Sequence, residues 1–152
     1  MLKAGDKIPE FEGTDQEGKT IKYSDYKGKK LVLYFYPRAN TPGCTAEGCS
    51  LRDNYHALQA QGFQIIGISA DPIEKQKSFH DKYSFPFPLI ADTDKKIIQS
   101  FGAWGKKKFM GKEYEGILRY TFVVDEEGII TRAITKVKTK NHAEQILEEI
   151  KK

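Results

Sequence analysis

The sequence predicts an α/β fold in which a mixed central sheet is flanked by helices and preceded by an N-terminal hairpin extension. Residues 31–36 form a continuous apolar run, and residues 63–69 alternate and are rich in isoleucine, so both segments are expected to be strands. Predicted strands alternate with predicted helices through the middle of the chain, and a strand hairpin and a final helix follow them. This order indicates parallel strands joined by helices, with antiparallel strands added by the late hairpin.

Turn and cap residues divide the chain into these elements. Gly18 joins the first two short strands, Ser24 opens a helical turn, and Gly62 closes the first long helix. Asp71 and Pro72 suit the cap and first position of the next helix. The expected elements are strands 11–14 and 20–23, a helical turn at 24–28, strand 31–36, helix 45–61, strand 63–69, helix 72–83, strand 87–90, helix 92–101, a hairpin or loop at 104–117, hairpin strands 120–125 and 129–136, and helix 141–152.

Length and composition restrict the class of protein. The 152 residues, of which 39% are hydrophobic, suit one domain spanning 1–152 with a substantial core. No apolar run is long enough to span a membrane, the first residues have no secretory core, and the net charge of +4 is too small for a nucleic-acid binder. Two cysteines are too few for a disulfide scaffold, so we expect a cytoplasmic protein with no membrane or nucleic-acid partner.

The two cysteines, Cys44 and Cys49, are the strongest functional signal. Cys44 lies where the strand predicted at 31–36 gives way to a helix, at the end of a strand where sites form in open sheets. Free N–H groups and the positive end of the helix dipole favour an anion there. A thiol at this position is expected to lose its proton readily, and the thiolate is the nucleophile.

The spacing of the two cysteines argues against a static structural disulfide. Five residues of ideal helix give about 7.5 Å of rise and about 140° of rotation, which places the two Cα atoms roughly 8–9 Å apart. A disulfide requires a Cα separation below about 7 Å. Cys44 and Cys49 are therefore expected to bond only after part of the helix has unwound.

Neighbouring residues offer further chemistry. Thr41 carries a hydroxyl that can donate to sulfur or to a bound oxygen, and Pro37 makes the exit from the strand rigid. Arg119 precedes a predicted strand and supplies a positive charge, although nothing in the sequence places it near Cys44, so the residue alone is interpreted as a surface arginine. Glu47 is interpreted as a partner of Arg119 or Arg52, or as a solvated residue that suits the helix dipole.

Other residues receive simpler interpretations. The three histidines, His56, His80 and His142, are scattered and are interpreted as surface residues rather than metal ligands. Gly48 lies between the cysteines, and glycine in a helix costs about 1 kcal/mol relative to alanine. We therefore hypothesise that Gly48 eases unwinding, and that Gly48→Ala slows formation of the disulfide.

Three sequence motifs together resemble the peroxiredoxin family, and its peroxiredoxin Q (bacterioferritin comigratory protein) branch in particular. Residues 37–44 read Pro-Arg-Ala-Asn-Thr-Pro-Gly-Cys and fit the family pattern of proline, three residues, threonine, two residues and cysteine. Residues 41–49, which end in the second cysteine, resemble this branch, and residues 116–125, Gly-Ile-Leu-Arg-Tyr-Thr-Phe-Val-Val-Asp, resemble its arginine-bearing strand. The similarity extends over nearly the whole chain.

The resemblance implies a thioredoxin-like fold and a thiol peroxidase. Cys44 would be the peroxidatic cysteine, Cys49 the resolving cysteine of an intramolecular disulfide, and Pro37, Thr41 and Arg119 would complete the active site. The implied substrate is hydrogen peroxide or an organic hydroperoxide, and the implied reductant is thioredoxin or a similar dithiol protein. No metal or organic cofactor is implied, and we expect a monomer because the disulfide needs no partner subunit.

Two other classes of function remain open at the level of the sequence. A thiol-disulfide oxidoreductase on the same fold would normally have two residues between its cysteines, not four. A redox sensor without catalytic turnover would pass its oxidation to a partner through a stable mixed disulfide. Peroxide consumption with a thioredoxin recycling system separates these classes from a peroxidase.

Overall fold

The main sheet of the computed structural model, which describes residues 2–151, has five strands in the order β5-β4-β3-β8-β9. β3 lies at the centre, where it pairs in parallel with β4 and antiparallel with β8. The predicted mixed sheet is therefore confirmed. The strands are β3 (Lys30–Phe35), β4 (Phe63–Ser69), β5 (Leu89–Ala91), β8 (Thr121–Val124) and β9 (Ile130–Ile134).

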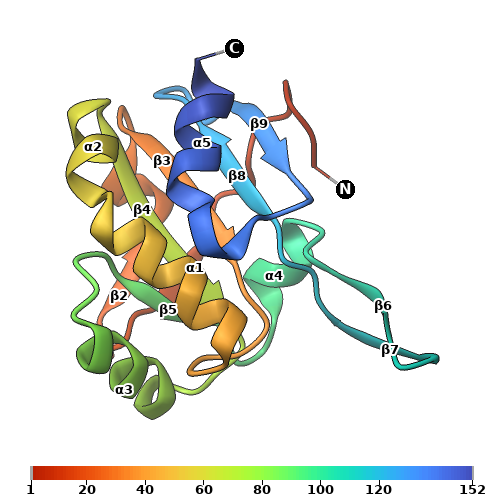
Figure 1. Ribbon diagram of the computed structural model, residues 1–152. Helices are drawn as coiled ribbons and strands as arrows, with labels where there is room; N and C mark the ends of the chain where they lie inside the picture. The colour runs from red at the N-terminus through yellow and green to blue at the C-terminus, as the bar shows by residue number, and fades with distance from the viewer. Residues whose placement is uncertain (1, 152) are drawn as a thin grey trace.

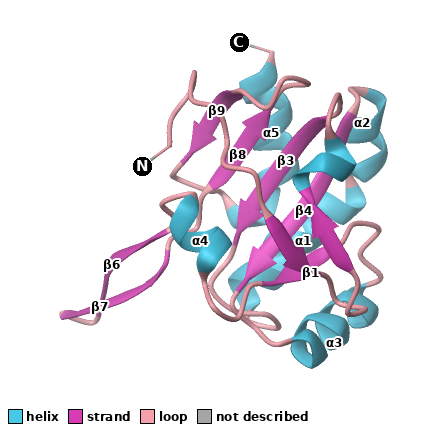
Figure 2. Cartoon of the chain, turned by 180° about the vertical axis from the view of Figure 1, so that it is seen from behind, coloured by secondary structure: helices cyan, strands magenta, loops and turns pink. Residues whose placement is uncertain are grey.

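Helices cover both faces of the sheet. Alternate side chains of β3 point to opposite faces, and the side chains on each face are apolar, so both faces must be covered. Val32 and Tyr34 pack in the cluster on one face, and Leu31, Leu33 and Phe35 pack in the cluster on the other. Figure 1 shows the first face, and Figure 2 shows α4 and β1 on the opposite side. The helices are α1 (Pro42–Asp53), α2 (Tyr55–Ala60), α3 (Ile73–Tyr83), α4 (Lys96–Ser100) and α5 (His142–Ile150), with short 3-10 turns η1 (Tyr23–Tyr26) and η2 (Thr139–Asn141).

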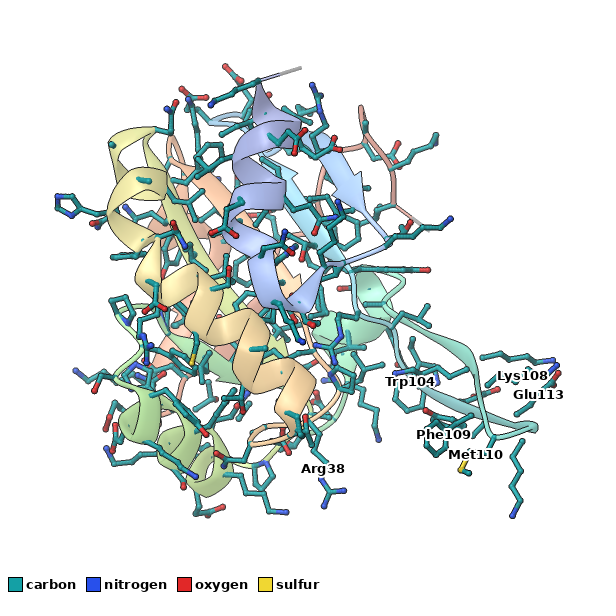
Figure 3. The ribbon with its side chains drawn as sticks, viewed as in Figure 1. Arg38, Trp104, Lys108, Phe109, Met110 and Glu113 are labelled. Carbon is teal, nitrogen blue, oxygen red and sulfur yellow. The ribbon has the colours of Figure 1, made fainter. Side chains whose placement is uncertain are left out.

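Two smaller hairpins complete the fold. The predicted N-terminal extension is confirmed as β1 (Glu12–Thr14) paired antiparallel with β2 (Thr20–Lys22). The segment predicted as a hairpin or loop is a hairpin of β6 (Trp104–Phe109) and β7 (Lys112–Ile117), which projects from the body of the molecule (Figure 1). Figure 3 shows Phe109 and Met110 at its far end, and they are 66% and 87% exposed.

The helix predicted at 45–61 differs from the structure at its start and in its middle. It begins at Pro42, so Cys44 lies inside the first turn of α1 and not before it. It breaks at Asn54, which separates α1 from α2. The Asn54 side chain donates to the Ser50 carbonyl at 2.9 Å and so competes with the backbone for a helical acceptor, which is a known way for asparagine to end a helix.

The helix predicted at 92–101 is shorter than expected because Asp92 caps it. The Asp92 carboxylate accepts hydrogen bonds from the N–H groups of Ile97 and Ile98, at 3.3 and 2.8 Å. Lys95 has a positive φ of 63°, so regular helix begins only at Lys96. The other elements agree with prediction to within two residues at each bound, except that the described part of the last helix ends at Ile150, and Lys152 lies outside the described residues.

Within residues 2–151, no helix is both long enough and apolar enough to cross a membrane.

Candidate active site

Cys44 is the third residue of α1 and lies just beyond the carboxyl end of β3. Its side chain is 1% exposed. Thr41 is the N-cap with an extended backbone, Pro42 occupies the first helical position, and the first helical hydrogen bond runs from the Thr45 N–H to the Thr41 carbonyl at 2.8 Å. The N–H groups of Gly43 and Cys44 therefore precede the helical ladder, and they create a local environment that favours an anion.

Arg119 lies against this helix start, so its interpretation as a surface arginine is wrong. β3 pairs with β8 such that Tyr34 is opposite Thr121, and the residues that precede β8 therefore lie beside the end of β3. The Arg119 guanidinium Nη2 is 3.3 Å from the point that a Cβ on Gly43 would occupy, so glycine permits the close approach. Burial disfavours the charge of Arg119, but attraction to Cys44 and Glu47 outweighs it and raises the pKa of Arg119.

Glu47 holds Arg119 from the next turn of α1. Its Oε1 accepts a hydrogen bond from the Arg119 Nη1 at 2.7 Å, and its side chain is fully buried. Of the three interpretations of Glu47, the pairing with Arg119 is confirmed, since Arg52 pairs with Asp53. Burial raises the pKa of Glu47 to about 7, although its ion pair and hydrogen bond with Arg119 act in the opposite direction.

Cys49 lies on the same unbroken helix, and both cysteines are free thiols. Cys49 is half-buried, and burial is the main reason that its pKa is raised. The positive charge of Arg52 partly opposes this effect, and the negative charge of Asp53 adds to it. Because α1 is continuous from residue 42 to residue 53, the spacing of an ideal helix keeps the two cysteines beyond the range of a disulfide.

The loop between β3 and α1 is anchored to the end of β4. The backbone N–H of Ala39 donates to Asp71 Oδ2 at 2.7 Å, and Ser69 Oγ donates to the same oxygen at 2.7 Å. Thr41 Oγ1 donates its hydrogen to the Arg38 carbonyl at 2.7 Å. The hydroxyl was expected to donate to sulfur or a bound oxygen, but in this structure only its lone pairs remain for a ligand. Pro37 lies half-buried in the same loop, directly after β3.

His142 is the residue that sequence reasoning missed. It is fully buried at the start of α5, with its Nε2 at 3.5 Å from Glu47 Oε2, so its interpretation as a surface histidine is wrong. A signal was present in the sequence, because His142 precedes Ile146 by four residues and therefore lies beside the apolar stripe of α5.

The hypothesis about Gly48 needs correction. A Cβ on Gly48 would lie 2.6 Å from Cζ of Phe85, whose ring stacks on Phe87 and meets Phe79 edge-on. Gly48 is thus required for packing of the Phe85 ring on α1. Gly48→Ala would displace that ring and strain the helix, so the variant cannot test intrinsic helix propensity alone.

Two further features of the described residues lead away from a second reactive centre. A surface hollow of about 270 Å³ is lined by residues such as Lys30, Phe63 and Leu147, and it lies at the amino ends of β3 and β4, away from Cys44. No group of three or more histidine, cysteine or acidic residues among residues 2–151 is arranged to hold a metal ion.

Comparisons with known proteins agree with this geometry. Residues 4–133 match the AhpC/TSA family. The chain is 43% identical over 150 residues to peroxiredoxin Bcp of Escherichia coli strain K12, covering 99% of this chain and 96% of that protein. A cysteine-to-serine mutant of PrxQ from Xylella fastidiosa has a TM-score of 0.92 at 30% identity, covering 99% and 96% of the two chains.

A second solved structure adds information about substrate. It is a bacterioferritin comigratory protein from Xanthomonas campestris, described in terms of its alkyl peroxide reduction activity. It has a TM-score of 0.86 at 33% identity, covering 93% of this chain and 90% of that one.

Proposed function

The chain belongs to the peroxiredoxin family, with its thioredoxin-like fold and its thiol peroxidase activity, and from this premise we propose that Cys44 is the residue that attacks the peroxide. The observation that carries the proposal is the approach of the Arg119 guanidinium to the first turn of α1, where its Nη2 is 3.3 Å from the Cβ position of Gly43, the residue before Cys44. Cys44 and Arg119 are 75 positions apart in the sequence, and both lie at the start of α1, where backbone N–H groups also point. Cys49, the other cysteine, lies in the second half of α1 and not at its N-terminus.

In the proposed reaction, the Cys44 thiolate attacks the terminal oxygen of a hydroperoxide. The S–O bond forms as the O–O bond breaks, the sulfur is oxidised to a sulfenic acid, and the leaving oxygen takes a proton to give water or an alcohol. Negative charge moves from sulfur to the leaving oxygen. Arg119 and the N–H groups at the start of α1 are fixed donors that stabilise this charge without reorganising.

Thr41 and Pro37 have supporting roles in this proposal. Because the Thr41 hydroxyl hydrogen is donated to the Arg38 carbonyl, the Thr41 oxygen offers lone pairs that can accept the O–H of a hydroperoxide. Such a hydrogen bond orients the substrate with its O–O bond toward the sulfur. Pro37 fixes the backbone where the loop leaves β3 and limits access of water from that side.

Cys49 is the proposed resolving residue. Its thiol condenses with the Cys44 sulfenic acid to give an intramolecular disulfide and one water molecule. The reaction requires α1 to open between the two residues, because ideal helix spacing keeps them beyond bonding distance. A dithiol protein such as thioredoxin then reduces the disulfide by exchange.

The remaining assignments follow from this cycle. We propose hydrogen peroxide and organic hydroperoxides as substrates, in keeping with the alkyl peroxide activity named for the Xanthomonas campestris relative. We further propose a monomer of one domain in a reducing cytoplasm, since both sulfurs of the disulfide come from one helix of one chain.

Single-turnover experiments with two variants test the roles of the cysteines. Cys44→Ser should abolish peroxide reduction, and Cys49→Ser should consume one equivalent of peroxide and then stall unless an external thiol is present. Retained turnover in Cys44→Ser would contradict the assignment. Rapid turnover with hydrogen peroxide and thioredoxin supports a peroxidase, whereas slow turnover with a persistent mixed disulfide would favour the redox sensor.

A further inference from the structure

Glu47 is buried with only one of its two oxygens satisfied. Oε1 accepts from Arg119, but Oε2 has no hydrogen-bond partner among the described residues. The side chain that faces Oε2 is His142, whose Nε2 is 3.5 Å away, and both side chains are 0% exposed. A buried carboxylate oxygen without a donor is costly, so this contact calls for an explanation.

The hydrogen-bond network of α5 fixes the tautomer of His142. Gln145 accepts from the Lys138 N–H through Oε1 at 2.9 Å and donates from Nε2 to the Lys136 carbonyl at 2.8 Å. Its Oε1 also lies 2.9 Å from His142 Nδ1, so Nδ1 carries the hydrogen. In a neutral ring, Nε2 is then a lone pair, and the Thr121 hydroxyl at 2.8 Å donates to it.

An ionised Glu47 would therefore place a charged oxygen opposite the lone pair of His142. A hydrogen on Glu47 Oε2 removes that conflict. We propose that in the resting enzyme Glu47 carries a proton on Oε2, which faces Nε2 of His142 at the longer distance of 3.5 Å and shares its lone pair with the Thr121 hydroxyl, so that the charge of Arg119 is not neutralised by Glu47 and acts on Cys44. This inference rests on the proposed role of Cys44, and it makes Glu47 and His142 positioning residues that act through Arg119.

Burial supports the same arrangement of protons. It raises the pKa of Glu47 to about 7 and lowers the pKa of His142 to about 4, so between about pH 4 and pH 7 the proton resides on Glu47 and the imidazole is neutral. Burial lowers the pKa of His142 most, and the nearby charge of Arg119 adds to this effect.

The other groups around Glu47 do not supply this proton. Arg119, from the segment before β8, favours the ionised carboxylate. Tyr34, from β3, remains a neutral phenol, because burial raises its pKa well above the ordinary value. Cys44 lies on the same helix, and Lys107 from β6 is near enough to Arg119 and Cys44 to interact with both. As the pH rises past about 7, Glu47 ionises and neutralises Arg119.

Nuclear magnetic resonance tests the proton directly and without reference to activity. The carboxyl carbon of Glu47 in the reduced wild-type protein, labelled with carbon-13 and assigned by its absence in Glu47→Gln, should titrate near pH 7. Nitrogen-15 spectra of His142 should show a neutral ring protonated at Nδ1. A Glu47 signal that titrates near the ordinary value of 4.5, or a His142 ring protonated at Nε2, would overturn the proposal.

Glu47→Gln provides a second test, because its amide reproduces the protonated state at every pH. The amide oxygen can accept from Arg119, and the amide N–H faces the lone pair of His142 Nε2 beside the Thr121 hydroxyl. The experiment measures the rate of alkylation of Cys44 in a Cys49→Ser background, with and without Glu47→Gln. The alkylation rate of Glu47→Gln/Cys49→Ser is divided by the rate of Cys49→Ser alone at each pH. This ratio should rise about threefold or more between about pH 6 and pH 8.5, because Glu47 ionises only in the second protein.

Asp53→Asn in the same background is the matched control. Asp53 is an exposed acidic residue of α1 that pairs with Arg52, so its variant should give a ratio that stays flat with pH. A flat or falling ratio for Glu47→Gln would overturn the proposal. A Cys44 that reacts in neither background would instead contradict the proposed function, and the carbon-13 titration would still decide where the proton lies.

Discussion

At the scale of single residues, Arg119 joins the two halves of the site. Its guanidinium binds Glu47 at 2.7 Å on one side and interacts with Cys44 on the other. Because Cys44 and Glu47 are both buried, these interactions are screened less than they would be at the surface. The charge of Arg119 is therefore expected to have a large effect on reactivity.

Replacing Arg119 tests this effect. Arg119→Met in a Cys49→Ser background should slow oxidation of Cys44 by hydrogen peroxide on the order of 10²-fold, the usual effect of removing one fixed donor from a reacting centre. Stopped-flow measurement of peroxide consumption gives the rate. Arg38→Met is the control, since Arg38 lies in the nearby loop with its side chain directed to solvent in Figure 3. Equal rates in the two variants would exclude the proposed role of Arg119.

The buried pair of Glu47 and His142 predicts an opposite pH dependence of stability in two variants. In Glu47→Gln only His142 remains. Its pKa in the folded state, about 4, lies below the unfolded value of 6.5, so stability is lost as the pH falls from 6.5 toward 4. In His142→Asn only Glu47 remains. Its folded pKa, about 7, lies above 4.5, so stability is lost as the pH rises from 4.5 toward 7.

In the wild type these two effects cancel between pH 4.5 and 6.5, because the folded and unfolded chains then bind the same number of protons at the pair. Urea unfolding across this range should therefore give opposite slopes for the two variants, with changes on the order of 2–3 kcal/mol. Slopes of the same sign in both variants would show that the two groups do not titrate as described.

The sequence was sufficient to propose part of the site but not its connections. The position of Cys44 follows from a strand followed by a helix, which are both local features. The approach of Arg119 depends on the pairing of β3 with β8, and the burial of Glu47 and His142 depends on the packing of α5 over α1. These contacts join residues that are distant in the sequence, so hydrophobic and capping patterns do not predict them, and only the resemblance to the peroxiredoxin Q branch placed Arg119 in the site.

At the scale of elements, α1 must be stable enough to position Cys44 and weak enough to open for Cys49. The Phe85 ring packs on Gly48, between the two cysteines, and belongs to an aromatic group with Phe79 and Phe87. Opening α1 requires this contact to be lost. The packing of Phe85 is therefore expected to control the rate of disulfide formation.

Phe85→Leu tests this control. The variant should form the disulfide about 3- to 10-fold faster after peroxide attack, because local opening of α1 costs less. Loss of free thiols in rapid-quench samples measures the rate. Phe101→Leu is the control, since Phe101 is equally buried but lies on the opposite face of the sheet. Both variants should lower the free energy of unfolding by about 1–3 kcal/mol. If disulfide formation were faster in both variants, general destabilisation and not the Phe85 contact would be the cause.

Prediction of the elements succeeded where hydrophobic pattern dominates and failed where side chains compete for the backbone. β4 was predicted at its observed bounds because its residues alternate and are rich in isoleucine. The break at Asn54 and the delayed start of α4 arise from hydrogen bonds of Asn54 and Asp92 with the backbone. Asparagine and aspartate occur in many helices, so their presence alone does not predict such a break.

At the scale of the whole molecule, the two halves of the proposed cycle depend on different parts of the fold. In the proposal, attack on peroxide depends on Cys44, Arg119, Glu47 and His142. They come from α1, the segment before β8 and α5, so this step depends on a formed sheet. Formation of the disulfide involves only α1 and its neighbours. A rate of disulfide formation that does not change with protein concentration is therefore expected of a monomer.

The most direct test of the account is intact-mass measurement and thiol titration after one equivalent of hydrogen peroxide. If Cys44 is oxidised and Cys49 captures it, the chain should lose the mass of two hydrogen atoms and both free thiols, with no covalent dimer. Cys49→Ser should instead gain one oxygen. Two thiols that remain free, or a disulfide-linked dimer of the wild type, would contradict the account.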